Sequence, residues 1–266
     1  MTSRRQFLRA LAATLPAAAL YELVHAAPQQ PSPPRSIWLP LMGQSQQSQP
    51  ARPAASQSVW LPLVGQMQPR DPFDWPILGP ASGTMRQAFD WLMARTRSYT
   101  AVDIARIVRA YARIGTHVGV DWFLAMAQMC HETGSLTSWW SDLPRRNPAG
   151  IGVSGATREG TPDTPPGAEW AWDGARWQAG WSFPSWADHA VPTHLGLLLA
   201  YALKDEHATD DQLTLMAQTL GGRNLGSLRG IAPTITGLNG RWAVPGTMYG
   251  QRIVVLARQM RAASAG

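Results

Sequence analysis

The chain has 266 residues, which is enough for one or two domains, and 45% of them are hydrophobic, which is enough for a compact core. The formal net charge is +6, and the basic side chains are almost all arginine, with Lys204 as the single lysine. A charge this modest, without a basic stripe, argues against nucleic-acid binding. Cys130 is the single cysteine, so no intramolecular disulfide can form.

The first 26 residues carry the pattern of an export signal. The stretch SRRQFLR at 3–9 resembles the twin-arginine motif and precedes an apolar run at 10–20 and a small-residue end at 24–26. The apolar run is too short to remain as a membrane-spanning helix, and no cysteine follows it to carry a lipid anchor. We therefore expect export to the periplasm, cell wall or exterior, with no permanent membrane span.

Residues 27–70 are rich in Pro, Gln and Ser and predict an extended linker. Two near-copies of one segment interrupt it, IWLPLMGQ at 37–44 and VWLPLVGQ at 59–66. Proline excludes a helix in these repeats and favours an extended backbone that could dock on a sheet edge or on another protein. Their role stays open.

From residue 71 the composition is that of a globular domain, which we expect to continue to residue 266. Residues 152–182 contain several tryptophans with Gly, Thr, Pro and acids, and predict hairpins or an irregular lobe. Capping boxes begin at Thr100 and Ser185, and Pro192 should restrict or kink the helix that it enters. The sequence predicts a mainly α fold with one small lobe, and its helices are expected at 84–97, 100–114, 121–133, 185–201, 210–220 and 247–263.

Beyond its capping residue, the helix at 121–133 holds one acid, Glu132, in an otherwise apolar run. Asp121 can cap its first turn, and Gly134 is a typical helix terminator. Glu132 shares a helix face with Gln128 and lies in the last turn. Apolar neighbours and the negative end of the helix dipole both raise the pKa of a carboxyl group placed there. A raised pKa suits a general acid that works near neutral pH.

Four segments resemble the glucosaminidase domain of bacterial cell-wall hydrolases, glycoside hydrolase family 73, in the family's order. They are HETG at 131–134, NPAGI at 147–151, WSFPSWADH at 181–189 and RWAVPGTMYGQRI at 241–253. The resemblance implies a lysozyme-like helical domain, a peptidoglycan substrate, Glu132 as catalytic acid and Tyr249 in the active site. The last segment departs from the family pattern at Trp242, where the family has Tyr, and at Val244, where it has Asp.

The remaining site residues are expected near these motifs. Trp139 and Trp140 are the predicted sugar platform, because Trp faces stack on sugar rings. Residues 147–151 are predicted to contact substrate through Asn147, Gly150 and Ile151, since glycine permits a close backbone approach. A second catalytic carboxylate should come from the lobe, with Glu159 as first choice and Asp163, Glu169 and Asp173 as the other candidates.

Three functions stay open. The first is hydrolysis of the N-acetylglucosaminyl β-1,4 bond of peptidoglycan with Glu132 as acid. The others are lytic transglycosylase chemistry, which needs only one acid/base Glu, and non-catalytic glycan binding on the same fold. His131-Glu132 begins a zinc-protease HExxH pattern, but Ser135 stands at the second His position. No phosphate-binding loop or zinc-ligand spacing is present, so no cofactor is predicted.

Overall fold

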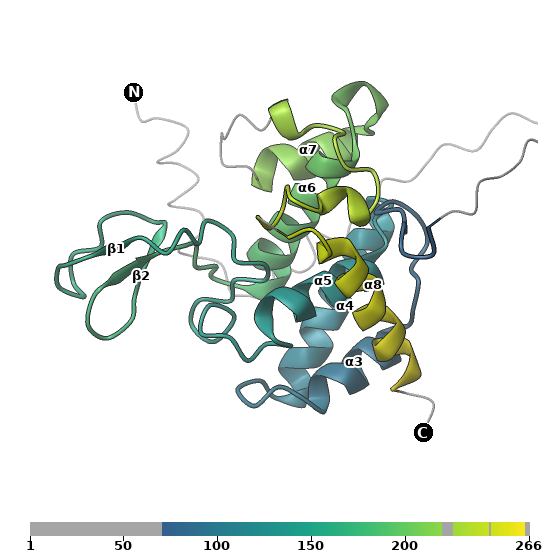
Figure 1. Cartoon of the computed structure of the whole chain (residues 1–266). Helices are drawn as coiled ribbons and strands as arrows, with labels where there is room; N and C mark the ends of the chain where they lie inside the picture. The colour runs from purple at the N-terminus through teal and green to yellow at the C-terminus, as the bar shows by residue number, and fades with distance from the viewer. Residues whose placement is uncertain (1–70, 220–225, 245, 264–266) are drawn as a thin grey trace, which may run out of the picture. The chain divides into compact units, whose positions relative to one another are not determined.

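The computed structural model describes residues 71–219, 226–244 and 246–263 (Figure 1). The export signal, the linker and the two repeats lie outside the described residues and stay predictions. Within the described ranges, no helix is long and apolar enough to cross a membrane.

The described chain is mainly helical, with one small sheet, which confirms the predicted class (Figure 1). The short 3-10 turns are Asp205–His207, Gly226–Leu228 and Thr236–Leu238. The sheet is antiparallel, in the order β1-β3-β2, and is formed by β1 (Thr157–Arg158), β2 (Trp170–Trp172) and β3 (Trp177–Ala179). The α-helices are α3 (Met85–Met93), α4 (Ala101–His117), α5 (Trp122–Thr133), α6 (Val191–Ala202), α7 (Asp210–Thr219) and α8 (Tyr249–Ala262).

Helix α5 lies at the centre of the hydrophobic core. It packs against α4 and α8, and less extensively against α3 and α6 (Figure 1). Each residue of α5 is buried except His131 and Glu132, which are partly exposed in the last turn. Full burial of one large apolar side chain contributes about 1.5–3 kcal/mol. The core therefore fixes α5 along its length and leaves its polar end at the surface.

Both ends of α5 form as the sequence predicts. The Asp121 carboxylate accepts hydrogen bonds from the N–H groups of Phe123 (3.1 Å) and Leu124 (3.0 Å). Gly134 ends the helix in the left-handed region, with φ of 58°. Ser135 and Leu136 continue in that region, with φ of 60° and 66°, so the chain reverses immediately after Glu132. Local sequence thus sets where the carboxyl group stands along the helix.

Three helix boundaries differ from the prediction by two residues or more, and one of them is the end of α4, which was expected at residue 114 and lies at His117. Helix α3 was expected to reach residue 97 but ends at Met93, and the Arg95 side chain just beyond it folds back towards the helix. The Arg95 guanidinium donates to the Trp91 carbonyl oxygen (3.2 Å) and stacks on the Trp91 ring. Helix α8 was expected from residue 247 and begins at Tyr249. The end of α3 is accompanied by a side-chain contact, which helix periodicity does not encode.

Helix α6 begins through an irregular turn that directly precedes a proline. Ser185 caps the start, since its hydroxyl accepts from the Asp188 N–H at 3.0 Å. A π-helical turn, Trp186–Ala190, follows and runs directly into α6. Pro192 lies in the first turn of α6, a position where proline is common because its fixed φ suits a helix. The proline restricts the helix start, as predicted.

The tryptophan-rich segment forms the predicted hairpins. Trp172 pairs with Trp177 across β2 and β3, and their rings meet edge to face at 5.4 Å. The Trp177 indole also donates to the Thr161 carbonyl oxygen at 3.1 Å. At the base of this lobe, the Trp181 N–H donates to the Ile151 carbonyl oxygen at 3.0 Å. This bond joins the lobe to the turn at 147–151.

Candidate active site

Packing of α5 against α8 brings Glu132 and Tyr249 together although 117 positions separate them. Glu132 stands in the last turn of α5, and Tyr249 is the first residue of α8. The Tyr249 hydroxyl donates a hydrogen bond to Glu132 Oε1. It accepts one from Gln128 Nε2 at 2.7 Å. The Trp242 side chain gives Glu132 a second hydrogen bond.

The electrostatics of this pair favour a protonatable carboxyl group beside a permanently neutral phenol. Burial raises the pKa of Glu132, and the hydrogen bonds from Tyr249 and Trp242 oppose part of that rise. Burial and the neighbouring Glu132 charge raise the pKa of Tyr249 far above its ordinary value. Tyr249 therefore acts as a hydrogen-bond donor near neutral pH and not as a base. The predicted effect of burial on Glu132 is confirmed.

Glu132 faces a cavity of about 410 Å³. His131 stands beside it, and burial and the charge of Arg252 both lower the pKa of this imidazole, so it is mostly neutral at pH 7. The cavity is lined by His131, Glu132, Ala243, Gly246, Thr247, Met248, Tyr249 and Arg252.

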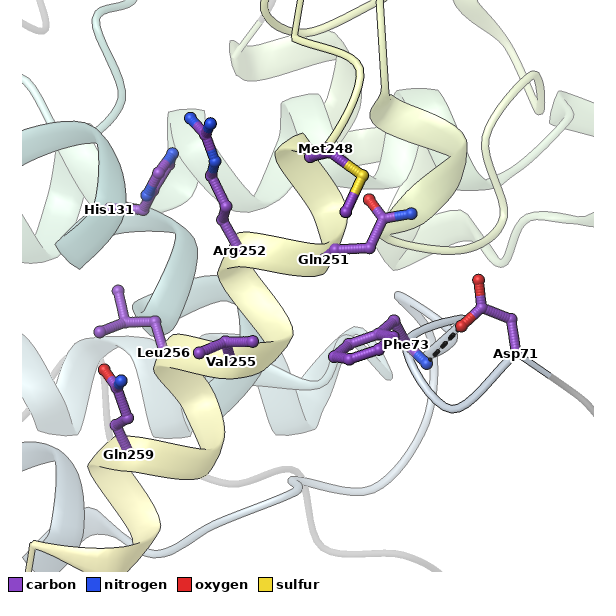
Figure 2. Close-up of a pocket in the computed structure, with 9 residues that line it drawn as sticks. All are labelled: Asp71, Phe73, His131, Met248, Gln251, Arg252, Val255, Leu256 and Gln259. Carbon is purple, nitrogen blue, oxygen red and sulfur yellow. Dashed lines mark hydrogen bonds between the residues drawn. The ribbon is translucent and has the colours of Figure 1, made fainter.

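A second depression, of about 750 Å³, continues along α8 (Figure 2). It shares His131, Met248 and Arg252 with the Glu132 cavity. Figure 2 shows His131 from α5 and Arg252 from α8 side by side, with Phe73 on the other side of α8's first turns. Together the two depressions form one groove, which we call the α8 groove, that starts at Glu132 and follows the outer face of α8.

The structure does not place Glu159 in the α8 groove. This residue is exposed and directly follows β1 in the lobe, and it lines neither depression. Asp173, another candidate, is used by the β2–β3 turn. Its carboxylate accepts from the N–H groups of Ala175 and Arg176 and from the Gln178 amide, and these bonds lower the pKa of Asp173 to about 2. Asp173 therefore shapes the hairpin.

Asn147 is fully buried, and its side chain is saturated by bonds within the protein. Its Nδ2 donates to the carbonyl oxygens of Ile151 and Trp181, both at 2.9 Å. Its Oδ1 accepts from the N–H groups of Ala149 (3.2 Å) and Ile151 (2.8 Å). An amide has two donors and two acceptor positions, so none is left for a ligand. Asn147 shapes the turn that presents Gly150 and Ile151.

Gly150 and Ile151 lie on the accessible side of this turn. Gly150 has φ of 60°, and no atom beyond its two chain neighbours lies within 4 Å of where a Cβ would stand. Ile151 lines a separate cavity of about 290 Å³ together with Trp181, Phe183 and His189. A backbone approach by a ligand at Gly150 is therefore open, and the predicted contact stays a prediction.

The two tryptophans predicted to form the sugar platform differ in how far their rings are accessible to a ligand. Their rings meet edge to face at 4.7 Å. Trp140 packs on Gly180 at the base of the lobe, where a Cβ would come within 2.4 Å of the indole. Trp139 is 36% exposed, but the Arg145 guanidinium stacks on its ring at 3.9 Å. A sugar could use the Trp139 ring only on the face that Arg145 leaves free.

Sequence reasoning missed Trp242 and Arg252 as site residues. Trp242 was recognised only as a departure from the family pattern, yet its side chain gives Glu132 a hydrogen bond. Arg252 follows Tyr249 by three residues, so helical spacing alone places it one turn further along the face that carries Tyr249. Among the described residues, no three His, Cys, Asp or Glu side chains lie close enough together to hold a metal ion.

No family model matches the chain, and no curated protein matches its sequence. A comparison with solved structures finds the catalytic domain of the autolysin Auto from Listeria monocytogenes. The match covers 69% of this chain and 98% of that domain, at 15% identity and a TM-score of 0.34. Similarity at this level does not assign the chain to a family.

Proposed function

We propose that the chain is an exported glycoside hydrolase that cleaves the N-acetylglucosaminyl β-1,4 bond of peptidoglycan. The observation that carries this proposal is Glu132, a half-buried carboxyl group of raised pKa at the start of an open groove, with a tyrosine hydroxyl bonded to one of its oxygens. The segments that resemble the glucosaminidase family support the substrate class. The test is hydrolysis of purified peptidoglycan by the full chain and by Glu132→Gln.

In this mechanism Glu132 protonates the glycosidic oxygen of the leaving sugar while positive charge develops at the anomeric carbon. The resulting carboxylate keeps its hydrogen bonds from Tyr249 and Trp242, which stabilise the charge that it gains. A second carboxylate from the lobe, with Glu159 as first choice, would attack that carbon or activate water. A separation of about 5 Å suits attack, and roughly 6.5–9.5 Å leaves room for water.

One observation favours lytic transglycosylase chemistry as a second candidate. In the part of the chain that the structure describes, Glu132 is the only carboxylate that lines its cavity. A transglycosylase needs one acid/base group, because the sugar's own hydroxyl closes an anhydro ring. Mass spectrometry of the released fragments separates the two, since hydrolysis leaves a reducing end and transglycosylation leaves an anhydro sugar.

The α8 groove predicts a role for Arg252 in binding the polymer. No described carboxylate lies within ion-pair distance of its guanidinium, and the stem peptides of peptidoglycan carry carboxylates. We expect Arg252→Gln to raise KM for peptidoglycan about fivefold with kcat nearly unchanged, because an exposed ion pair contributes about 1 kcal/mol. Steady-state kinetics at low salt measure this. Arg113→Gln removes the same charge from an exposed position on α4, outside the groove, and should leave KM unchanged.

Export through the twin-arginine pathway is a part of the proposal that can be tested separately from catalysis. Replacement of both Arg4 and Arg5 with lysine is expected to trap nearly all of the precursor inside the cell, because the twin-arginine pathway reads the arginine pair. Immunoblots of cytoplasmic and exported fractions measure the distribution. Replacing Arg9 alone with lysine is the control. Normal secretion of the Arg4/Arg5 variant would rule out this route.

A further inference from the structure

The hydrogen bond between Gln128 and Tyr249 continues into a buried chain of polar side chains. Gln128 Oε1 lies 3.2 Å from His194 Nε2. His194 Nδ1 lies 2.8 Å from the Tyr111 hydroxyl. Tyr111, Gln128 and His194 are each 0% exposed, within helices that are otherwise largely apolar on this side. A polar set buried this deeply has to satisfy itself, since each unmet group costs about 1–3 kcal/mol.

The chain of bonds has one direction when Glu132 is ionised. A carboxylate only accepts, so Tyr249 must donate to it and then accepts from the NH₂ group of Gln128. The Gln128 oxygen therefore faces His194, whose Nε2 must carry the hydrogen. Burial lowers the pKa of His194 to about 3, so the ring is neutral and carries one N–H. Its Nδ1 is bare and accepts from the Tyr111 hydroxyl.

We propose that Tyr111, His194 and Gln128 are positioning residues that keep the Tyr249 hydroxyl donating its hydrogen bond to Glu132 Oε1. The exchangeable proton of the Glu132 acid then resides on Oε2. The catalytic meaning of this relay rests on the proposed function, but the relay itself does not. When Oε1 of a carboxylic acid already accepts a hydrogen bond, the acid carries its own proton on Oε2. The relay thus decides which oxygen of Glu132 delivers the proton.

Several charged and titratable groups surround the relay. His131 and Arg252 line the Glu132 cavity with Tyr249. The charge of Tyr201 would act on Tyr249, and that of Cys130 on Tyr111. Burial raises the pKa of Cys130 to about 12, so the thiol stays neutral. The Trp242 ring lies edge-on to His194 at 5.9 Å and also bonds Glu132, so one neutral side chain contacts both His194 and Glu132.

The experiment measures the pKa of Glu132 directly, by ¹³C NMR of the full chain labelled at the Glu side-chain carboxyl and assigned with Glu132→Gln. Tyr249→Phe should raise this pKa by about one unit, because it removes a hydrogen bond to a charged group. Gln128→Met, of similar size and without polar atoms, should raise it by at least half as much. In the Tyr249→Phe background, Gln128→Met should add almost nothing, because the relay acts through Tyr249.

The control is Met126→Leu, a volume-conserving change in the core of the same helix, which should not move the pKa. If Gln128→Met fails to fold, Tyr111→Phe removes a single hydroxyl at the far end and should shift the pKa in the same direction by a smaller amount. Additive shifts, or an unchanged pKa in folded Gln128→Met and Tyr111→Phe, would overturn the relay. If the coupled shifts appear in a protein that cleaves no glycan, the relay stands and the proposed function fails.

Discussion

The Glu132→Gln variant is expected to lose at least a hundredfold in the rate of peptidoglycan cleavage while it still binds the glycan. Glutamine keeps the size of the side chain and an oxygen that accepts from Tyr249, but it has no proton to give to the leaving group. Removal of a general acid costs on the order of a hundredfold to ten-thousandfold. Release of soluble fragments from purified sacculi gives the rate, and cosedimentation with sacculi gives the binding.

The stability of this variant provides a control with a predictable sign. Because burial raises the folded-state pKa of Glu132, its contribution to stability is complete at low pH and is lost as the pH rises through that raised value. At pH 7 the wild type thus carries the cost of a half-buried carboxylate, and Glu132→Gln does not. We expect its Tm at pH 7 to equal or exceed that of the wild type, with the difference vanishing below about pH 4.

Retained cleavage would refute the assignment. If Glu132→Gln digests purified peptidoglycan at nearly the wild-type rate, Glu132 is not the acid. If neither the wild type nor the variant cleaves while both bind, the chain is a glycan-binding protein. In both cases the unchanged or raised Tm shows that the variant is folded.

The Asn147→Ala variant is expected to lose about 3 kcal/mol or more of its free energy of unfolding. The change removes four hydrogen bonds and leaves N–H and C=O groups of Ile151, Ala149 and Trp181 without a side-chain partner. Each buried group left unmet costs about 1–3 kcal/mol, less where water enters. For a domain of this size the Tm should fall by roughly 6–12 °C, which circular dichroism measures.

The comparison with Ser154→Ala separates a structural from a ligand-binding role for Asn147. Ser154 is exposed four residues beyond Gly150, and its loss should change the Tm by less than about 1 °C. An Asn147→Ala protein with the wild-type Tm but a higher KM would show that the amide contacts substrate and that its internal bonds are dispensable.

The parts of the fold that follow from local sequence were predictable. Helix α5 begins after Asp121 and ends before Gly134 as expected, because capping and left-handed termination depend on adjacent residues. The end of α3 was predicted wrongly because Arg95 turns back onto Trp91, and the periodicity of the segment carries no trace of that contact. The hairpins could be expected from composition, but the register of Trp172 with Trp177 could not.

The same distinction holds for the site. Glu132 was identifiable as the single acid in an apolar helix, and Tyr249 by its motif. The relay joins positions 66 to 121 residues apart and leaves two faint signals in the sequence, Gln128 in the apolar helix at 121–133 and a histidine in the apolar run at 191–202. Asn147 was located by its motif. That hydrogen bonds within the protein occupy its whole side-chain amide could be seen only from the structure, which places Trp181 beside the turn.

The chain leaves α5 through three consecutive left-handed residues, Gly134, Ser135 and Leu136. For the two that carry a Cβ, this backbone costs on the order of 1–3 kcal/mol each. Buried contacts hold it, since the Leu136 N–H donates to Thr133 Oγ1 (3.0 Å) and the Trp91 indole donates to Ser135 Oγ (3.1 Å). Glycine at either position would remove the strain, but it would also delete the Ser135 hydroxyl that accepts from Trp91 or the fully buried Leu136 side chain. The turn after Glu132 therefore exchanges backbone strain for buried side-chain contacts.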